Sequence, residues 1–254
     1  MPTQISFNRY DYFGILFPGS LVTATIFLLF PEIISGINSY ISTASGMVIL
    51  FSAFFTFIGI LMCYIVGLVV TSLGRWILED IIIGKKIGYP GDILFNVKKQ
   101  DRDDTSPSSR KKRIWLKVYR KPYSPDFINS FNKIFSEYFD SNLLKDQKDK
   151  FSLCFATVKE HCPATLDRLN VFISLYGLNR NLVAAFLILS GLVIAQAIKI
   201  LNPLPLIWLI LFTFLIYVHF KTFLKFFRTY GDEVFRTFFI FASEQLQKGK
   251  QKND

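Results

Sequence analysis

The sequence predicts an all-α integral membrane protein, with four transmembrane helices and a mostly helical cytoplasmic domain between the second and the third. The first observation behind this prediction is that no charged residue occurs between Glu32 and Arg75. Three more runs without Asp, Glu, Lys or Arg approach bilayer length, at 12–31, 181–198 and 200–220. About twenty apolar residues cross the hydrocarbon core as a helix, which satisfies every backbone polar group internally.

The distribution of positive charge is the second observation. Of 29 Lys and Arg residues, 20 lie within 73–180 and 7 follow Phe220. Cytoplasmic loops collect Lys and Arg, so we expect the central segment and both termini in the cytoplasm. The segments 33–45 and 199–204 then face outward. The three cysteines fall in a predicted span or on the predicted cytoplasmic side, where thiols stay reduced. This distribution is compatible with a bacterial inner membrane.

The first membrane hairpin is expected over 1–72, with spans at about 12–34 and 45–72. We expect the first span to be retained, since no basic region precedes it and no small-residue cleavage site follows it. Pro18 and Gly19 predict a kink within it, because proline removes one intrahelical hydrogen bond. Two readings stay open for the kink: a helix entering from an interfacial segment, or the hinge of a gate.

The second span should continue into the cytoplasm until Gly84, or until the Gly-Tyr-Pro-Gly run at 88–91, stops the helix. Beyond it, weak alternation at 92–97 and 114–119 is compatible with a small two-stranded element. The polar, charged segment 98–113 between them predicts a mobile basic loop. Together with the helices that follow, these segments form an expected cytoplasmic domain over 73–180.

Three helices are predicted in the rest of that domain. Ser124-Pro125-Asp126 supplies an N-cap, a proline at the first position and an acid in the first turn. The second helix spans about 145–161, and the third begins at Pro163 and leads towards the membrane. The second membrane hairpin, 181–220, then has spans at about 181–200 and 204–220.

The last segment, 221–254, is basic and rich in phenylalanine. Two placements are open for it. It could lie on the inner leaflet as an amphipathic helix. It could instead extend the fourth span and pack on the helices of the central domain, which carry matching apolar stripes.

Candidate sites inside the spans are few. The centres of the second, third and fourth spans contain no acid, base or histidine, which disfavours an ion-coupled transporter. Ser190, Gln196 and Thr213 are the candidates for lining a pore, or for hydrogen bonding between helices.

No catalytic, cofactor-binding or metal site is predicted. The chain has only two histidines, and Cys154, His161 and Cys162 lack a fourth ligand at a standard zinc spacing. No glycine-rich phosphate loop with the Lys-Ser/Thr pair occurs.

The strongest surface feature is a basic cluster that could set topology, contact anionic lipid of the inner leaflet, or bind a nucleic acid, a nucleotide or an acidic partner. Nucleic acid is disfavoured, because too few aromatic residues interleave with it. The cluster consists of Arg110, Lys111, Lys112, Arg113, Lys117, Arg120 and Lys121.

Two short motifs carry a resemblance. The opening Asp-Tyr-Phe-x4-Pro-Gly at 11–19 and the Tyr-Gly-x-x-Arg-Asn at 176–181 are similar to motifs of uncharacterised bacterial four-span membrane proteins, some associated with antiviral defence loci. The resemblance implies four spans with a cytoplasmic domain between the second and third. From the residues themselves, Arg75, Trp76, Arg180 and Asn181 are candidates either for anchoring at the inner headgroups or for joining the domain to its spans.

Three hypotheses for function follow. The first is a non-enzymatic, homo-oligomeric inner-membrane protein whose cytoplasmic domain senses a soluble partner or signal and alters membrane integrity, in the manner of a defence effector. The second is a passive anchor or scaffold that recruits a soluble effector. The third, a membrane enzyme, would have to rely on acids that form no recognisable pattern.

Overall fold

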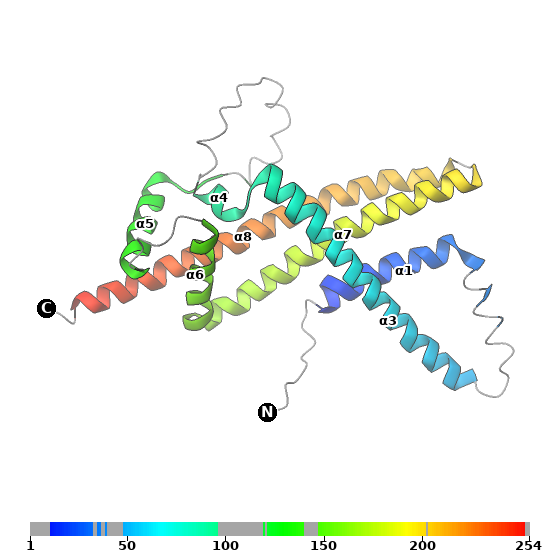
Figure 1. Ribbon diagram of the computed structural model, residues 1–254, viewed down its shortest axis with the longest axis horizontal. Helices are drawn as coiled ribbons and strands as arrows, with labels where there is room; N and C mark the ends of the chain where they lie inside the picture. Colours follow the sequence, from blue (N-terminus) through cyan, green and yellow to red (C-terminus); the bar gives the residue numbers. More distant parts are fainter. Residues whose placement is uncertain are drawn as a thin grey trace, which may run out of the picture. The chain divides into compact units, whose positions relative to one another are not determined.

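The computed structural model describes residues 11–32, 35–36, 39, 48–95, 119, 121–139, 147–201 and 203–251, and Figure 1 labels their main helices. These residues form helices, turns and short connections, with no strand among them. Four helices within these ranges are long and apolar enough to cross a membrane: Tyr12–Leu29, Ala53–Leu94, Pro163–Ile200 and Leu204–Gln251. The predicted helical class and the four helices of bilayer length are therefore confirmed.

The chain forms two compact units. Unit 1 comprises Met1–Ile82 and Ser174–Phe223, and unit 2 comprises Ile83–Ile173 and Leu224–Asp254. Three helical segments contribute residues to both units: η2 (Arg75–Ile87), α7 (Pro163–Ile200) and α8 (Ile207–Gln251). Each unit has its own buried apolar cluster.

In unit 1, a π-helical turn, η1 (Asp11–Leu16), leads into α1 (Phe17–Leu29), which packs against α3 (Val48–Gly74) and crosses it in Figure 1. The two backbones meet at a pair of glycines. A Cβ on Gly19 would lie 2.6 Å from the amide nitrogen of Gly67 and would clash with the carbonyl oxygen of Cys63. Small residues permit such close approach between membrane helices.

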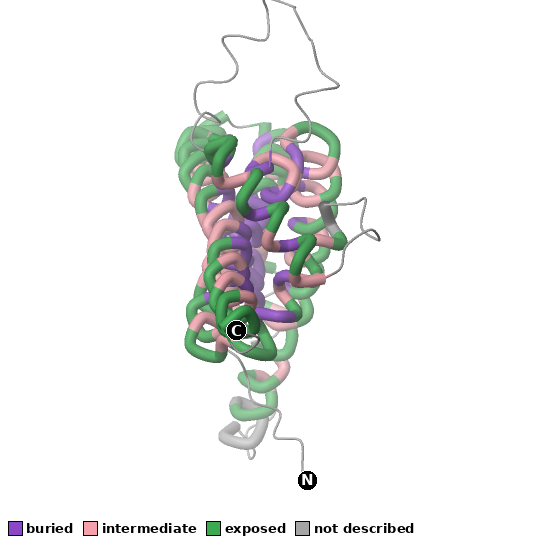
Figure 2. Tube along the Cα trace, turned by 90° about the vertical axis from the view of Figure 1, so that its left-hand side faces the viewer, coloured by how far each residue is buried: buried purple, intermediate pink, exposed green. Residues whose placement is uncertain are grey.

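The rest of unit 1 is a hairpin of α7 and the first half of α8, joined through the short 3₁₀ turn η6 (Leu204–Leu206). Leu201, at the end of α7, has a φ of 54°, a left-handed conformation that is uncommon for a non-glycine residue. The Phe186 ring on α7 stacks against His219 on α8 and packs at a tilt against Phe212 on the same helix. Figure 2 colours the trace by burial: α7 is buried continuously over 179–186, whereas α8 is intermediate or exposed over 207–222.

Many of the exposed residues in unit 1 are large and apolar. On α3 they include Phe54, Phe57 and Ile60, and on α8 they include Trp208 and Ile210. A water-soluble protein rarely exposes so much apolar surface, whereas hydrocarbon tails cover it at no cost. This surface fits helices that cross a bilayer.

Unit 2 begins in η2, which continues the helix of α3 and ends at Ile87, directly before Gly88. Of the two predicted stops, the run at 88–91 is therefore the one observed, and Gly84 lies within the helix. Gly88 has a φ of 101°, a conformation that favours glycine. Three further helices follow in the chain: α4 (Pro90–Leu94), α5 (Pro125–Phe139) and α6 (Gln147–His161). The predicted N-cap of α5 is confirmed, since Ser124 Oγ accepts a hydrogen bond of 3.3 Å from the backbone N–H of Phe127.

The prediction of a small two-stranded element is wrong for the part of it that falls in the described residues. Residues 92–94, expected to open its first strand, belong to helix α4. Pro90 at the first position and Asp92 in the first turn favour a helix start, and burial of Leu94 fixes the turn in the core. The rest of the expected strands lies outside the described residues, except Phe95 and Tyr119, which are turns. The predicted loop 98–113 lies outside the described residues entirely.

The core of unit 2 is built from aromatic rings. Phe131 of α5 lies 5.7 Å from the ring of Phe235 and 5.8 Å from that of Phe238 on α8, and all three side chains are fully buried. Such pairs contribute about 0.5–1.5 kcal/mol each beyond their buried area. Of the two placements left open for the phenylalanine-rich tail, packing on the central helices is the one observed.

Candidate functional site

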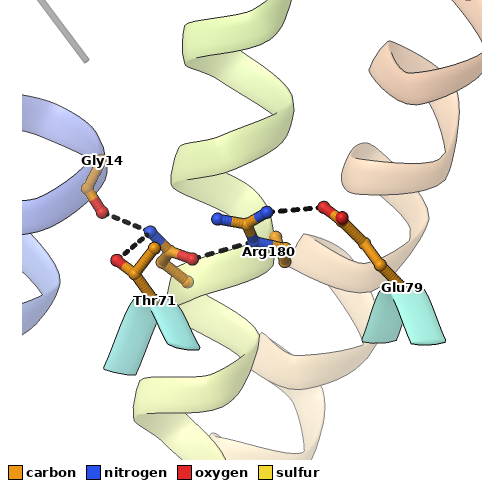
Figure 3. A network of polar contacts seen from close by, with 5 residues as sticks. Gly14, Thr71, Glu79 and Arg180 are labelled. Carbon is orange, nitrogen blue, oxygen red and sulfur yellow. Dashed lines mark hydrogen bonds and ion pairs between the residues drawn. The ribbon is translucent and has the colours of Figure 1, made fainter. Parts of the chain in front are cut away.

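A buried ion pair lies within unit 1. The guanidinium of Arg180 on α7 donates a 2.5 Å hydrogen bond to the carboxylate of Glu79 on η2 (Figure 3). The Arg180 side chain is 2% exposed and that of Glu79 is 18% exposed. Burying two charges costs several kcal/mol per ion, which a close pair offsets only when its remaining polar atoms are also satisfied.

Asn181, the next residue on α7, satisfies one of those atoms and extends the contact to two more elements. Its Oδ1 accepts a 3.0 Å hydrogen bond from Nε of Arg180. Its Nδ2 donates to the backbone carbonyl of Gly14 at 2.5 Å and to the hydroxyl of Thr71 at 2.8 Å. Asn181 is completely buried. We call Gly14, Thr71, Glu79, Arg180 and Asn181 the polar network.

Pro18 lies four residues after Gly14, whose carbonyl accepts the hydrogen bond from Asn181. In an α-helix the carbonyl of residue 14 would accept from the N–H of residue 18, and proline has no N–H to donate. The side chain of Asn181 donates to the carbonyl of Gly14 from another helix. Pro18 and Gly19 are both buried.

Gly74, at the end of α3, gives the network its space. A Cβ there would lie 3.2 Å from Oδ1 of Asn181 and 3.4 Å from Cβ of Ala184. A side chain at this position would crowd α7 away from α3. The close approach of the two helices, and with it the short hydrogen bonds, depends on glycine.

A second polar contact joins α7 to α8. Asn179 uses its Nδ2 to donate to the carbonyl of Leu175 at 2.7 Å, and its Oδ1 lies 2.8 Å from Nδ1 of His219. Because Oδ1 can only accept, Nδ1 of His219 carries the proton in this arrangement. Three consecutive residues of α7, 179–181, are therefore buried and hydrogen-bonded to other parts of unit 1.

The other predicted residues do not join the network. Arg75 and Trp76 are exposed, with Trp76 at 57%. Ser190 donates to the carbonyl of Phe186 one turn back on its own helix, at 2.7 Å. Thr213 is exposed.

Gln196 forms a contact between helices. Its Nε2 lies 3.4 Å from the carbonyl of Leu29 on α1, and its Oε1 is buried without a hydrogen-bond partner. Of the basic cluster, only Lys121 falls in the described ranges, and its backbone carbonyl accepts a 2.7 Å hydrogen bond from Arg228.

Sequence reasoning singled out Arg180, Asn181, Pro18 and Gly19 but missed the partners that complete the network. Glu79 carried one signal, since it is the first acidic residue after Glu32 and lies in the helix expected to continue from the second span into the cytoplasm. Thr71, Gly14 and Gly74 carried none, because small residues are common throughout membrane helices. Among the described residues, no group of three or more His, Cys, Asp or Glu side chains could hold a metal ion.

No protein-family model matches this chain, and searches of the curated proteins and of the solved structures give no match. The resemblance of its two motifs to bacterial four-span proteins stays a prediction. The two motifs are nevertheless joined in space, since Asn181 of the second hydrogen-bonds Gly14 of the first.

Proposed function

We propose that this chain is a non-enzymatic, homo-oligomeric protein of the bacterial inner membrane, with both termini in the cytoplasm, that alters membrane permeability when a signal reaches unit 2. In this proposal the polar network is a latch that holds the resting arrangement of the membrane helices. A soluble protein is the kind of partner we expect on unit 2.

The buried pair of Arg180 and Glu79 is the observation that carries the proposal. Buried ion pairs are often no more stabilising than apolar residues of the same size, and ionisable residues next to membrane spans commonly mark function. A pair that contributes little net stability but costs much to break suits a latch with two distinct states. Asn181 adds η1 and α3 to the same latch through Gly14 and Thr71.

The route from signal to latch follows from the length of α7. This helix runs from Pro163 to Ile200 without a break, and its first turns belong to unit 2 while Arg180 belongs to unit 1. Force on the first turns would pass along a continuous helix to Arg180. Release of the latch would let α7 shift against α1 and α3. The membrane helices would then repack and open a path through the membrane.

The test is to break the latch without a signal. Glu79→Gln keeps the size of the side chain and removes the charge that pairs with Arg180. Its matched control is Asp80→Asn, the same chemical change at the neighbouring, exposed residue of η2. Each variant is expressed in bacterial cells that are loaded with a potential-sensitive dye.

We expect Glu79→Gln to depolarise the cells, while the unaltered chain and Asp80→Asn leave the potential intact. A Glu79→Gln protein that is present in the membrane at normal amount and leaves the potential intact would refute the latch. If that protein also copurifies with a stoichiometric soluble partner, the passive scaffold becomes the better account. The association with antiviral defence is proposed from the motif resemblance alone, and survival of expressing cells under phage challenge tests it.

A further inference from the structure

An apolar groove lies between the start of the first membrane helix and the middle of the second, wholly within unit 1. Phe13 and Phe17 form one wall, and Thr56, Gly59, Ile60 and Cys63 of α3 form the other. Its volume is about 490 Å³. No residue of the polar network lines it.

The helix crossing explains the groove. The contact of Gly19 with Gly67 brings two backbones together at one point, and the helices diverge on either side of it. At Gly59 the lining lacks a side chain, and a Cβ built there meets no atom within 4 Å. Among the described residues, no neighbouring side chain closes the space at Gly59.

Water is a poor occupant for this groove. A stable water needs two to four polar partners, and Ser20, one of the few polar residues here, already donates to the carbonyl of Phe17 at 2.8 Å. Both walls belong to helices that are long and apolar enough to cross a membrane. In the hydrocarbon region an open apolar groove fills with hydrocarbon.

The size of the groove matches one lipid tail. An engineered apolar cavity of about 150 Å³ binds a benzene ring, so a groove of about 490 Å³ has room for a longer hydrocarbon chain. Residues 12–20 cover about 12 Å at 1.5 Å per residue, close to the depth of one leaflet, which is about 15 Å. Tyr12, an aromatic residue of the kind found at headgroup level, stands at the end of the groove.

We infer that this groove binds one acyl chain of a phospholipid. With the N-terminus in the cytoplasm, as proposed above, the lipid belongs to the inner leaflet. The bound chain completes the packing of α1 against α3 and so supports the crossing that presents the carbonyl of Gly14 to Asn181.

The experiment fills the groove from within. Gly59→Leu places a side chain in the open space, and Gly191→Leu is its control, because a Cβ at Gly191 on α7 also meets nothing within 4 Å but Gly191 does not line the groove. The purified full-length chain is equilibrated with palmitoyl-oleoyl phosphatidylethanolamine and phosphatidylglycerol, and retained lipids are counted by native mass spectrometry. Helix content from circular dichroism shows that each variant is folded.

We expect Gly59→Leu to retain one lipid fewer per chain than either the unaltered protein or Gly191→Leu, with its oligomeric state unchanged. An equal lipid count in all three proteins would overturn the inference. If Gly59→Leu dissociates the oligomer while the lipid count stays equal, the inference is also overturned. The groove would then be assigned to contact with a second copy of the chain. None of these outcomes depends on the potential assay, so a failed latch and a failed lipid site are distinguishable.

Discussion

Replacing Asn181 by leucine tests whether Pro18 and Asn181 act together. Leucine has nearly the same size but no polar atoms, so the change removes the hydrogen bonds of Asn181 while keeping its packing. Two groups lose a hydrogen bond: the carbonyl of Gly14, and Nε of Arg180. Thr71 keeps its own bond, since its hydroxyl donates to the carbonyl of Gly67 at 2.8 Å.

The magnitude follows from the number of orphaned groups. A buried polar group without a partner costs about 1–3 kcal/mol, so two of them cost about 2–6 kcal/mol. For a chain of about this length, 1 kcal/mol shifts Tm by about 2–4 °C. A loss of about 3 kcal/mol therefore lowers Tm by about 6–12 °C.

Pro18→Ala supplies the second half of a double-mutant cycle. Alanine restores an N–H at residue 18, which can donate to the carbonyl of Gly14 within the helix. In that background Asn181→Leu orphans one group instead of two, so its effect on Tm should fall by roughly half. The four proteins of the cycle are melted in the same detergent and followed by circular dichroism, with Asn129→Leu, an exposed position on α5, as the control for added apolar surface.

Two results would refute this reasoning. One is an Asn181→Leu protein that melts at the same temperature as Asn129→Leu. The other is an equal Tm loss with Pro18 and with alanine at residue 18, which would mean that the carbonyl of Gly14 does not depend on Asn181.

The remaining predictions concern packing and reactivity. Gly19→Ala should lower Tm strongly and Gly191→Ala should not, because the first Cβ meets the backbone of α3 and the second meets open space. Tyr123→Phe should cost about 1 kcal/mol in chemical denaturation, since it removes the 2.6 Å hydrogen bond to Asp232 and keeps the ring; an unchanged midpoint would contradict this. Burial raises the pKa of the Cys154 thiol, so Cys154 should resist maleimide at neutral pH in the folded protein and react only after unfolding, as peptide mass spectrometry would report.

The sequence determined the elements that depend on local chemistry. Runs without charge predicted helices of bilayer length, because any charge at the centre of a span is costly. The Ser-Pro-Asp start of α5 and the stop at Gly88 were predictable for the same kind of reason, since capping and the left-handed conformation are properties of a few neighbouring residues. The strand expected at residue 92 failed because weak alternation competed with a proline and an acid that start a helix.

Tertiary structure alone decided which residues meet. Nothing in the spacing of Arg180 and Glu79, 101 positions apart, tells that they pair, because a hydrogen bond forms only where two helices place donor and acceptor within about 3 Å. The same holds for Asn181 and the carbonyl that Pro18 leaves open, and for the groove that Gly59 leaves unfilled. Polarity along the chain fixes which segments become helices, and the shapes of small residues fix where those helices touch.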